Sequence, residues 1–294
     1  MQKRVRLIPA IVILMALLGT ALFCYPAVSN YLAEKNQSEI IGSYDSELAK
    51  MREEDYRKEW DKAEQYNQSL AGDPVRDPFL EGSGMALPQN YLDVLNVNGI
   101  MGYIEIPKIA VNLPIYHGTD EETLKKGVGH IRQTALPIGG MGTHPVLTGH
   151  TGLPSAELFT NLDQLEIGDK FFIHVLDQTL AYQVDAINVV EPNETALLEP
   201  DWDKDYVTLI TCTPYGVNSH RLLVRGIRVE YIPEEEEALR LEGHAWGKNE
   251  QILLFMGICA GVTVLILWLI FLFWRRRRTK KKKQSETERY WWKE

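Results

Sequence analysis

The stretch Thr208-Leu209-Ile210-Thr211-Cys212-Thr213-Pro214-Tyr215-Gly216 places a cysteine where a predicted strand gives way to a loop. The β-favouring run 206–210 leads directly into Cys212, and Pro214 and Gly216 then interrupt regular structure. Arg221 follows nine residues later at the head of a second apolar run, so a returning strand would bring it beside the sulfur. The stretch alone leaves two interpretations open, an ordinary hairpin with a buried cysteine and a nucleophile at a strand end.

Short strand-like runs occur before this stretch, within it and after it. Clusters of Gly, Pro, Asn and Asp separate them, which is typical of a closed or nearly closed β-barrel of about eight strands. A further segment, 156–162, is expected to form one or two helical turns. The sequence shows no internal repeat, no nucleotide-binding glycine loop and no zinc-ligand spacing. The strand-like runs are 102–106, 111–115, 144–148, 170–175, 180–187, 207–210 and 222–227.

Two uncharged apolar segments, 7–28 and 252–274, are each long enough to cross a bilayer at about 20 residues per span. Basic residues precede the first and follow the second, so the positive-inside rule places both termini in the cytoplasm and the intervening chain outside. The first segment could instead be a signal peptide cleaved near Ala27-Val28-Ser29. Its apolar stretch is longer than a usual signal core, and we therefore favour an uncleaved anchor.

This topology changes the meaning of the three cysteines. Cys24 and Cys259 lie within the apolar segments, which leaves Cys212 as the only cysteine in the exported part. An unpaired thiol outside the cell has no intramolecular disulfide partner, so it must be either buried or chemically active. The pattern favours a reactive thiol.

Charge is divided between the two sides of the membrane. Residues 26–251 contain 18 Lys and Arg against 37 Asp and Glu, whereas residues 275–294 contain 10 basic and 3 acidic residues. The exported part therefore lacks the basic surface that phosphate contacts require, and nucleic acid is excluded as a partner. The basic tail fits the anionic lipid of an inner leaflet.

The segment before the barrel divides at a change of composition. Residues 29–70 are polar with apolar residues at loose helical spacing, which predicts one or two amphipathic helices. Residues 71–90 are rich in Gly and Pro and predict a long loop, either a linker or a lid, and composition alone favours a linker. Within it, Asp77-Pro78-Phe79 joins a carboxylate to an aromatic ring through a stiff proline. The expected order is a cytoplasmic N-terminus (1–6), an anchor (7–28), a helical segment (29–70), a loop (71–90), the barrel (91–232), an acidic juxtamembrane linker (233–251), a second span (252–274) and a basic cytoplasmic tail (275–294).

A cysteine needs a base to attack an acyl carbon at neutral pH, because only its thiolate is strongly nucleophilic. A nearby histidine can take the thiol proton and later protonate the leaving amine. His150 is the best candidate because it ends a strand-like run that enters a glycine loop, as Cys212 does. The other six histidines are poorer candidates or are expected to be structural or exposed: His117, His130, His144, His174, His220 and His244.

These residues carry a resemblance to a known family. The segment 208–212 resembles the TLxTC signature of sortases, Thr148-Gly149-His150 resembles their histidine segment, and Arg221 stands where their catalytic arginine follows the cysteine. The match spans about residues 97–230 and departs from the usual pattern at 132–135, where the family more often has Gly-Thr-Ser. This departure concerns a loop and none of the three catalytic positions. Further matching segments are 106–109, 113–118, 158–162 and 214–221.

Two features resemble class C sortases, the group that polymerises pilins: the second apolar span and Asp77-Pro78-Phe79, which is similar to their lid motif. The resemblance favours a lid over a linker. It implies that Asp77 pairs with Arg221 and that Phe79 lies over Cys212. The fold it implies is mainly β, a closed eight-stranded sortase-type β-barrel with short helices, preceded by amphipathic helices and flanked by two transmembrane helices.

The implied activity is transpeptidation at the surface of a Gram-positive cell. Cys212 would cleave an LPxTG-like sorting signal between Thr and Gly, His150 would act as acid and base, and Arg221 would hold the substrate and the developing oxyanion. A lysine of the next pilin subunit would then resolve the thioacyl-enzyme as an isopeptide bond. The implied partners are pilin and surface-protein substrates with such a signal, the acceptor pilin lysine and membrane lipid, and no metal or cofactor is expected.

Two alternatives remain open. A housekeeping sortase would attach surface proteins to a cell-wall precursor, although the lid motif and the second span argue against it. A protein of another class, a membrane-tethered adhesin or assembly scaffold without catalytic activity, would carry Cys212 merely as a buried residue.

Overall fold

The computed structural model describes residues 2–70, 75–77, 79, 87–243, 254, 257–259, 261–266, 268 and 270–272. The chain divides into two compact units. One comprises Met1–Val28 with Gly247–Glu294, and the other is Ser29–Trp246. The second unit contains the barrel and all of the candidate catalytic residues.

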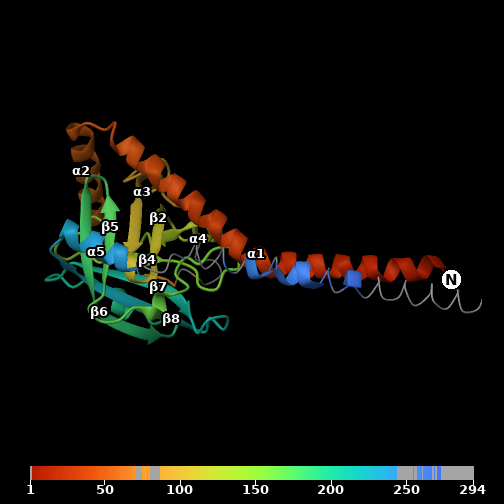
Figure 1. The fold of residues 1–294 in the computed structure, drawn as a ribbon. Coiled ribbons are helices and arrows are strands. Elements are labelled where there is room, and N and C mark those ends of the chain that lie inside the picture. Colours follow the sequence, from red (N-terminus) through yellow and green to blue (C-terminus); the bar gives the residue numbers. More distant parts are fainter. Residues whose placement is uncertain are drawn as a thin grey trace, which may run out of the picture. The chain divides into compact units, whose positions relative to one another are not determined.

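Eight strands close into a barrel, in the order β1-β2-β3-β4-β7-β8-β6-β5 (Figure 1). Two neighbouring pairs, β2 with β3 and β4 with β7, are parallel, and the other six are antiparallel. The predicted closed barrel of eight strands is therefore confirmed. The strands are β1 (Gly102–Ile106), β2 (Val111–His117), β3 (Val128–His130), β4 (Val146–Thr148), β5 (Lys170–Val175), β6 (Gln178–Val190), β7 (Tyr206–Thr213) and β8 (His220–Val229).

Strand β3 is the one strand that the sequence patterns missed. It is only three residues long and has Gly129 at its centre, so it carries no alternating apolar pattern. Pairing with β2 on one side and β4 on the other holds it in place. A Cβ at Gly129 would collide with the carbonyl oxygen of Gly118, so glycine is required by this close backbone approach.

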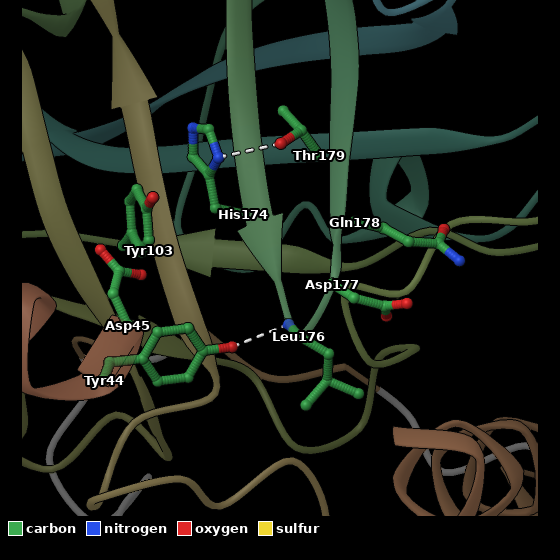
Figure 2. A pocket seen from close by; sticks show the side chains of 8 residues that line it. All are labelled: Tyr44, Asp45, Tyr103, His174, Leu176, Asp177, Gln178 and Thr179. Carbon is green, nitrogen blue, oxygen red and sulfur yellow. Dashed lines mark hydrogen bonds between the residues drawn. The ribbon is translucent and has the colours of Figure 1, made fainter. Parts of the chain in front are cut away.

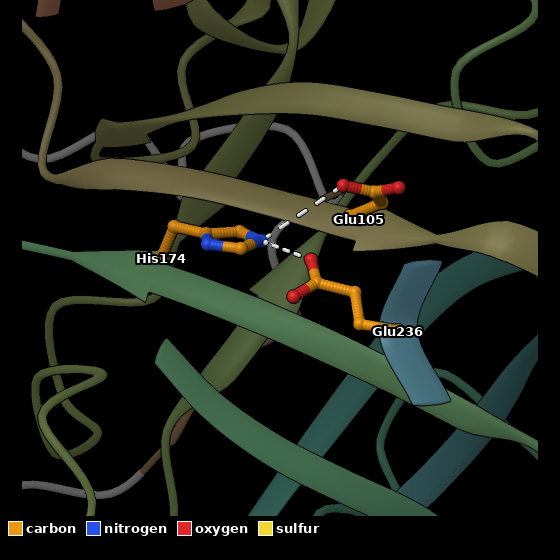
Figure 3. A group of neighbouring side chains, drawn as sticks. All are labelled: Glu105, His174 and Glu236. Carbon is orange, nitrogen blue, oxygen red and sulfur yellow. Dashed lines mark ion pairs between the residues drawn. The ribbon is translucent and has the colours of Figure 1, made fainter. Parts of the chain in front are cut away.

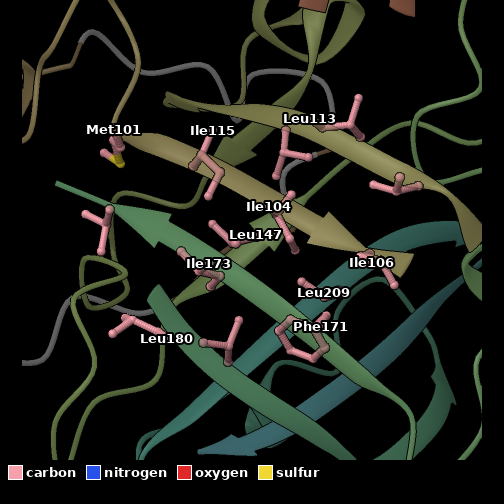
Figure 4. Close-up of a cluster of buried hydrophobic side chains, with 14 of the residues drawn as sticks. Met101, Ile104, Ile106, Leu113, Ile115, Leu147, Phe171, Ile173, Leu180 and Leu209 are labelled. Carbon is pink, nitrogen blue, oxygen red and sulfur yellow. The ribbon is translucent and has the colours of Figure 1, made fainter. Parts of the chain in front are cut away.

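The barrel interior is filled by alternate side chains of its strands, several of which are shown in Figure 4. Burial of one such side chain contributes about 1.5–3 kcal/mol, so the interior is the main source of stability in this unit. The best-buried aliphatic members include Ile104, Ile106, Ile115, Leu147, Ile173 and Leu209, none of which has measurable exposed surface.

Helices surround the barrel. The expected helices over 29–70 occur as the second half of α1 and as α2. At 156–162 the structure has single hydrogen-bonded turns, such as Thr160 N–H to the Glu157 carbonyl, and a 3₁₀ helix begins at Leu162. The α-helices are α1 (Gln2–Leu48), α2 (Glu53–Ser69), α3 (Gln89–Leu92), α4 (Glu121–Lys126) and α5 (Pro233–Gly243). The 3₁₀ helices are η1 (Pro107–Ile109), η2 (Leu162–Gln164) and η3 (Ala196–Leu198).

Among the described residues, one helix is long and apolar enough to cross a membrane, the Ile13–Leu48 part of α1. The predicted second span, 252–274, coincides with a shorter apolar helix, Gly257–Leu272, so a second crossing is not shown. The basic tail at 275–294 lies outside the described residues, as do most residues of the loop 71–90.

One phenol attaches α1 to the barrel. The fully buried Tyr44 donates a hydrogen bond to the carbonyl oxygen of Met101 at 3.2 Å and accepts one from the backbone N–H of Leu176 at 2.8 Å. Figure 2 shows the second of these bonds at the turn between β5 and β6. Burial raises the pKa of Tyr44 far above its ordinary value, so the phenol keeps its proton. A single side chain thus satisfies two backbone groups from separate loops.

Replacing Tyr44 by phenylalanine is expected to lower the free energy of unfolding by about 1–3 kcal/mol, because a buried N–H and a buried C=O lose their partner. Urea unfolding of the full chain in detergent measures the change. Tyr215→Phe is the matched control, since Tyr215 is 69% exposed, and it should change stability by less than about 0.5 kcal/mol. Equal effects of the two substitutions would contradict the role assigned to Tyr44.

Candidate active site

Cys212 and Arg221 are direct neighbours on antiparallel strands. Cys212 lies near the end of β7, and its Cα partner in the register is Arg221, the second residue of β8. Both side chains are buried, with 9% and 6% of their surface exposed. The hairpin that the sequence predicted therefore places the guanidinium group on the strand next to the thiol.

His150 is brought to the same end of the barrel by the parallel pair β4 and β7. Thr148 is in register with Ile210, so His150 and Cys212 each follow two residues beyond the last matched pair. Two hydrogen bonds extend this pairing, from Gly149 N–H to the Ile210 carbonyl at 3.1 Å and from Thr211 Oγ1 to the Gly149 carbonyl at 2.8 Å. The histidine loop is thus tied directly to the cysteine strand.

The other described histidines are occupied by structural partners. His130 is fully buried between the Tyr91 hydroxyl and the Ala135 carbonyl, and burial lowers its pKa to about 3. The backbone carbonyl of His150 accepts from Phe159 N–H at 3.1 Å, but its imidazole forms no hydrogen bond with the described residues. The remaining partners are Val94 O for His117, Glu199 O and Thr208 Oγ1 for His144, Thr179 Oγ1 for His174, and Ser219 Oγ for His220, whereas His244 lies outside the described residues.

Asp77 forms a buried, two-pronged ion pair with Arg221. Arg221 Nε donates to Asp77 Oδ1 at 2.9 Å, and Arg221 Nη2 donates to Asp77 Oδ2 at 2.6 Å. The two side chains are 3% and 8% exposed, so the pair is shielded from water. Arg221 Nη1 is held separately by the backbone carbonyls of Asn218 and His220, which fix the guanidinium plane independently of Asp77.

Phe79 covers the same group of residues. Its ring lies 5.5 Å from the ring of His150, and the guanidinium carbon of Arg221 lies 5.1 Å from its centroid. Val75 and Phe79 also pack on a buried apolar cluster beside the site, which we call the covered cluster; its members are Ile131, Val146, Leu198, Ile210 and Leu223. Pro78 lies outside the described residues. The segment around Asp77 therefore contacts the arginine, the histidine and the apolar surface next to them.

The electrostatics of the site hold both reactive groups neutral. Burial raises the pKa of the Cys212 thiol, and the negative charge of Asp77 raises it further, while Arg221 acts in the opposite direction. Burial lowers the pKa of His150; Glu121 on α4 opposes this shift and Lys125 adds to it. At neutral pH the thiol is therefore protonated and the imidazole is uncharged.

A second cluster of ionisable residues lies between β1, β5 and α5 (Figure 3). His174 Nε2 is 3.1 Å from Glu236 Oε1 and 3.9 Å from Glu105 Oε2. These are metal-binding types of side chain, but Arg240 already holds both oxygens of Glu105 at 2.7 Å. The cluster therefore works as an ion-pair network that fastens α5 to the barrel. The segment 233–251, expected as a linker, begins with this packed helix.

A pocket of about 200 Å³ lies beside this network (Figure 2). It adjoins the turn of the β5–β6 hairpin, where Val175 pairs with Gln178. At its other end, β6 pairs through Val190 with Arg221, and Arg221 is the register partner of Cys212. The pocket therefore lies at the end of β6 that is remote from Cys212. Its lining residues are Tyr44, Asp45, Tyr103, His174, Leu176, Asp177, Gln178 and Thr179.

Sequence reasoning missed several residues that act on the site. Glu121 and Lys125 sit on a short helix far from His150 in the chain, and no local pattern indicates that their charges reach the imidazole. Thr211 stands inside the quoted motif, but its bond to Gly149 becomes visible only once β4 and β7 are paired. Val75 precedes the lid motif by two residues and looks like an ordinary loop residue.

Comparisons with known proteins show what the chain as a whole is similar to. A family model described as Sortase domain matches residues 104–229. Sortase A of Bacillus anthracis is 27% identical over 225 residues, which cover 76% of this chain and 96% of that protein. The crystal structure of sortase C-1 from Actinomyces oris is 53% identical, with a TM-score of 0.59, and the match covers 60% of this chain and 99% of that one. Sortase C1 of Streptococcus agalactiae is 41% identical with a TM-score of 0.63, over 68% of this chain and 99% of that one.

Asp77→Asn and Phe79→Ala are each expected to speed alkylation of Cys212 by about tenfold or more. Asp77→Asn weakens the charge-assisted hydrogen bonds that hold the segment closed and removes a charge that raises the pKa of the thiol. Phe79→Ala removes the ring that lies against His150 and Arg221. The measurement is the rate of iodoacetamide labelling of the Cys212 peptide by mass spectrometry, which separates it from Cys24 and Cys259.

The matched control for these variants is Asp185→Asn. Asp185 forms the same two-pronged pair with Arg225, further along β8, at 3.0 and 2.8 Å, and its loss should leave the labelling rate unchanged. Unchanged labelling in both Asp77→Asn and Phe79→Ala would make the segment 71–90 a plain linker.

Proposed function

Because the chain belongs to the sortase family of cysteine transpeptidases, we propose that it is a class C, pilin-polymerising sortase with a lid over its active site. The observation that carries the proposal is the buried pair between Asp77 and Arg221, together with Phe79 against His150. Similarity to solved sortase C structures, at 41–53% identity, supports the same assignment. The proposed substrates are pilin and surface proteins with an LPxTG-like sorting signal.

The proposed first half-reaction is acylation of Cys212. His150 takes the thiol proton as the sulfur attacks the Thr carbonyl carbon of the Thr–Gly bond in the signal. The oxyanion that forms lies beside Arg221, whose planar donors suit it. His150 then gives its proton to the departing glycine amine, which leaves a thioester on Cys212.

The proposed second half-reaction transfers the acyl group to an acceptor pilin lysine. The neutral lysine amine attacks the thioester, His150 accepts the amine proton, and the thiolate leaves as the isopeptide bond forms. The proton then returns from His150 to the sulfur. His150 accepts and returns each proton in this cycle, so the proposed reaction requires no cofactor.

Withdrawal of the lid prepares Arg221 for this chemistry. When Asp77 leaves, Nε and Nη2 of Arg221 become free, while Nη1 keeps its bonds to the Asn218 and His220 carbonyls. The guanidinium therefore stays in place and offers two donors to the incoming peptide. In this proposal the lid carboxylate occupies the position that the substrate later takes.

Membrane attachment places the enzyme next to its substrates. We assign the anchor to α1 and a second crossing to the predicted span 252–274, with both termini in the cytoplasm and the catalytic unit outside. Substrates that are themselves held by a C-terminal membrane segment would present their sorting signal just above the bilayer. The same placement also suits a housekeeping sortase, so the acceptor must be identified by experiment.

The full chain, reconstituted in detergent or vesicles with pilin subunits, is expected to form ladders of covalent oligomers that resist SDS. Cys212→Ala should reduce ladder formation by about 10³-fold or more, because it removes the nucleophile. Mass spectrometry of the product identifies the isopeptide bond and its lysine. Transfer to a cell-wall precursor in place of a lysine would favour the housekeeping alternative, and the absence of both products would favour a scaffold.

The pH dependence of peptide cleavage provides a separate check on His150. Lys125 disfavours the imidazolium form and lowers the pKa of His150, so Lys125→Met should move the acid limb of kcat/KM to higher pH. Glu121→Gln should move it to lower pH, because Glu121 favours the imidazolium. Lys126→Met, which removes the neighbouring charge on α4, is the control and should leave the limb in place. Identical profiles in all three variants would argue against His150 as the group that titrates.

A further inference from the structure

Thr148 carries a buried hydroxyl group without a hydrogen-bond partner. In the part of the chain that the structure describes, only two buried side-chain polar atoms lack one, Thr148 Oγ1 and His174 Nε2. His174 Nε2 lies 3.1 Å from an oxygen of the Glu236 carboxylate, whereas Thr148 Oγ1 has no hydrogen-bond partner in the described part of the chain. Thr148 has no exposed surface. An unpaired buried hydroxyl costs free energy, and its presence therefore calls for a physical reason.

The Thr148 side chain lies on the same face of the sheet as the covered cluster and not on the face that fills the barrel interior. Side chains alternate along β4: Leu147 belongs to the barrel core, and Val146 belongs to the covered cluster. Thr148 shares the face of Val146, and its register partner Ile210 is also a member of the covered cluster. Val75 and Phe79 pack on this cluster from outside. The unpaired oxygen thus belongs to the apolar face that the lid covers, two residues before His150.

We propose that Thr148 is a substrate-binding residue whose hydroxyl forms a hydrogen bond with the backbone of the bound sorting peptide. This inference rests on the proposed function. An extended peptide carries N–H and C=O groups along its length, and its apolar side chains can take the places of Val75 and Phe79 on the covered cluster. A hydroxyl can donate or accept, so it can pair with either backbone group.

The same hydroxyl weakens the closed lid. In the closed state Thr148 Oγ1 is buried without a partner, in the open state water can reach it, and in the peptide complex the backbone pairs with it. The Thr148 hydroxyl therefore favours binding of the peptide over closure of the lid on the covered cluster, which only one of them can occupy at a time. It acts through binding and takes no part in the transfer of the acyl group.

Thr148→Val and Thr148→Ser separate the hydroxyl from the shape of the side chain. Valine keeps the shape and removes the hydroxyl, so kcat/KM for an LPxTG peptide should fall about tenfold, mainly through KM. The same variant should slow iodoacetamide labelling of Cys212, because the closed lid no longer buries an unpaired group. Serine keeps the hydroxyl and should retain kcat/KM within about twofold.

The outcomes distinguish this inference from the function on which it rests. Equal kcat/KM for the wild type and Thr148→Val, or an equal loss in Thr148→Ser, would overturn the role of the hydroxyl while leaving the sortase activity intact. A wild-type chain that neither cleaves the peptide nor forms ladders would overturn the proposed function and this inference with it. Faster labelling in Thr148→Val would contradict the effect on the lid.

Discussion

The buried ion pair between Asp77 and Arg221 is the interaction that joins the segment around Asp77 to the site and sets the charge environment there. Both charges are almost fully removed from water, which is costly unless each remains paired. Loss of one partner would leave the other as an isolated buried charge. Arg221 must therefore always meet a carboxylate, water or another oxygen acceptor, and under the proposed function the lid and the substrate compete for this one group.

The barrel topology explains why Arg221 lies beside Cys212 and at the same end of the barrel as His150. The antiparallel register of β7 and β8 fixes Arg221 beside Cys212, and the parallel register of β4 and β7 brings His150 to the same end. Neither relation depends on the lid. The catalytic groups can thus keep their positions when Asp77 and Phe79 move, and only access and electrostatics change.

The sequence predicted what local patterns encode, and it missed what only packing creates. The strand runs and the cysteine hairpin follow from alternation and turn residues, and the placement of His150 follows from a strand that enters a glycine loop. Strand β3 has no pattern of its own, because neighbouring strands and the close approach at Gly129 define it. The docking of α5 through Arg240 and Glu105 depends on residues 135 positions apart. The unpaired hydroxyl of Thr148 is likewise a property of its surroundings and not of its position in a motif.

Under the proposed function, opening of the lid couples access to reactivity at Cys212. In the closed state burial and the charge of Asp77 both raise the pKa of Cys212, and only Arg221 opposes them. Departure of the lid admits water and removes the negative charge, and both changes favour the thiolate. The Asn218 and His220 carbonyls retain Arg221, so the one group that stabilises the thiolate stays behind. In the proposed mechanism Cys212 therefore remains protonated and covered until a ligand displaces Asp77, and the same movement that exposes the sulfur also makes it nucleophilic.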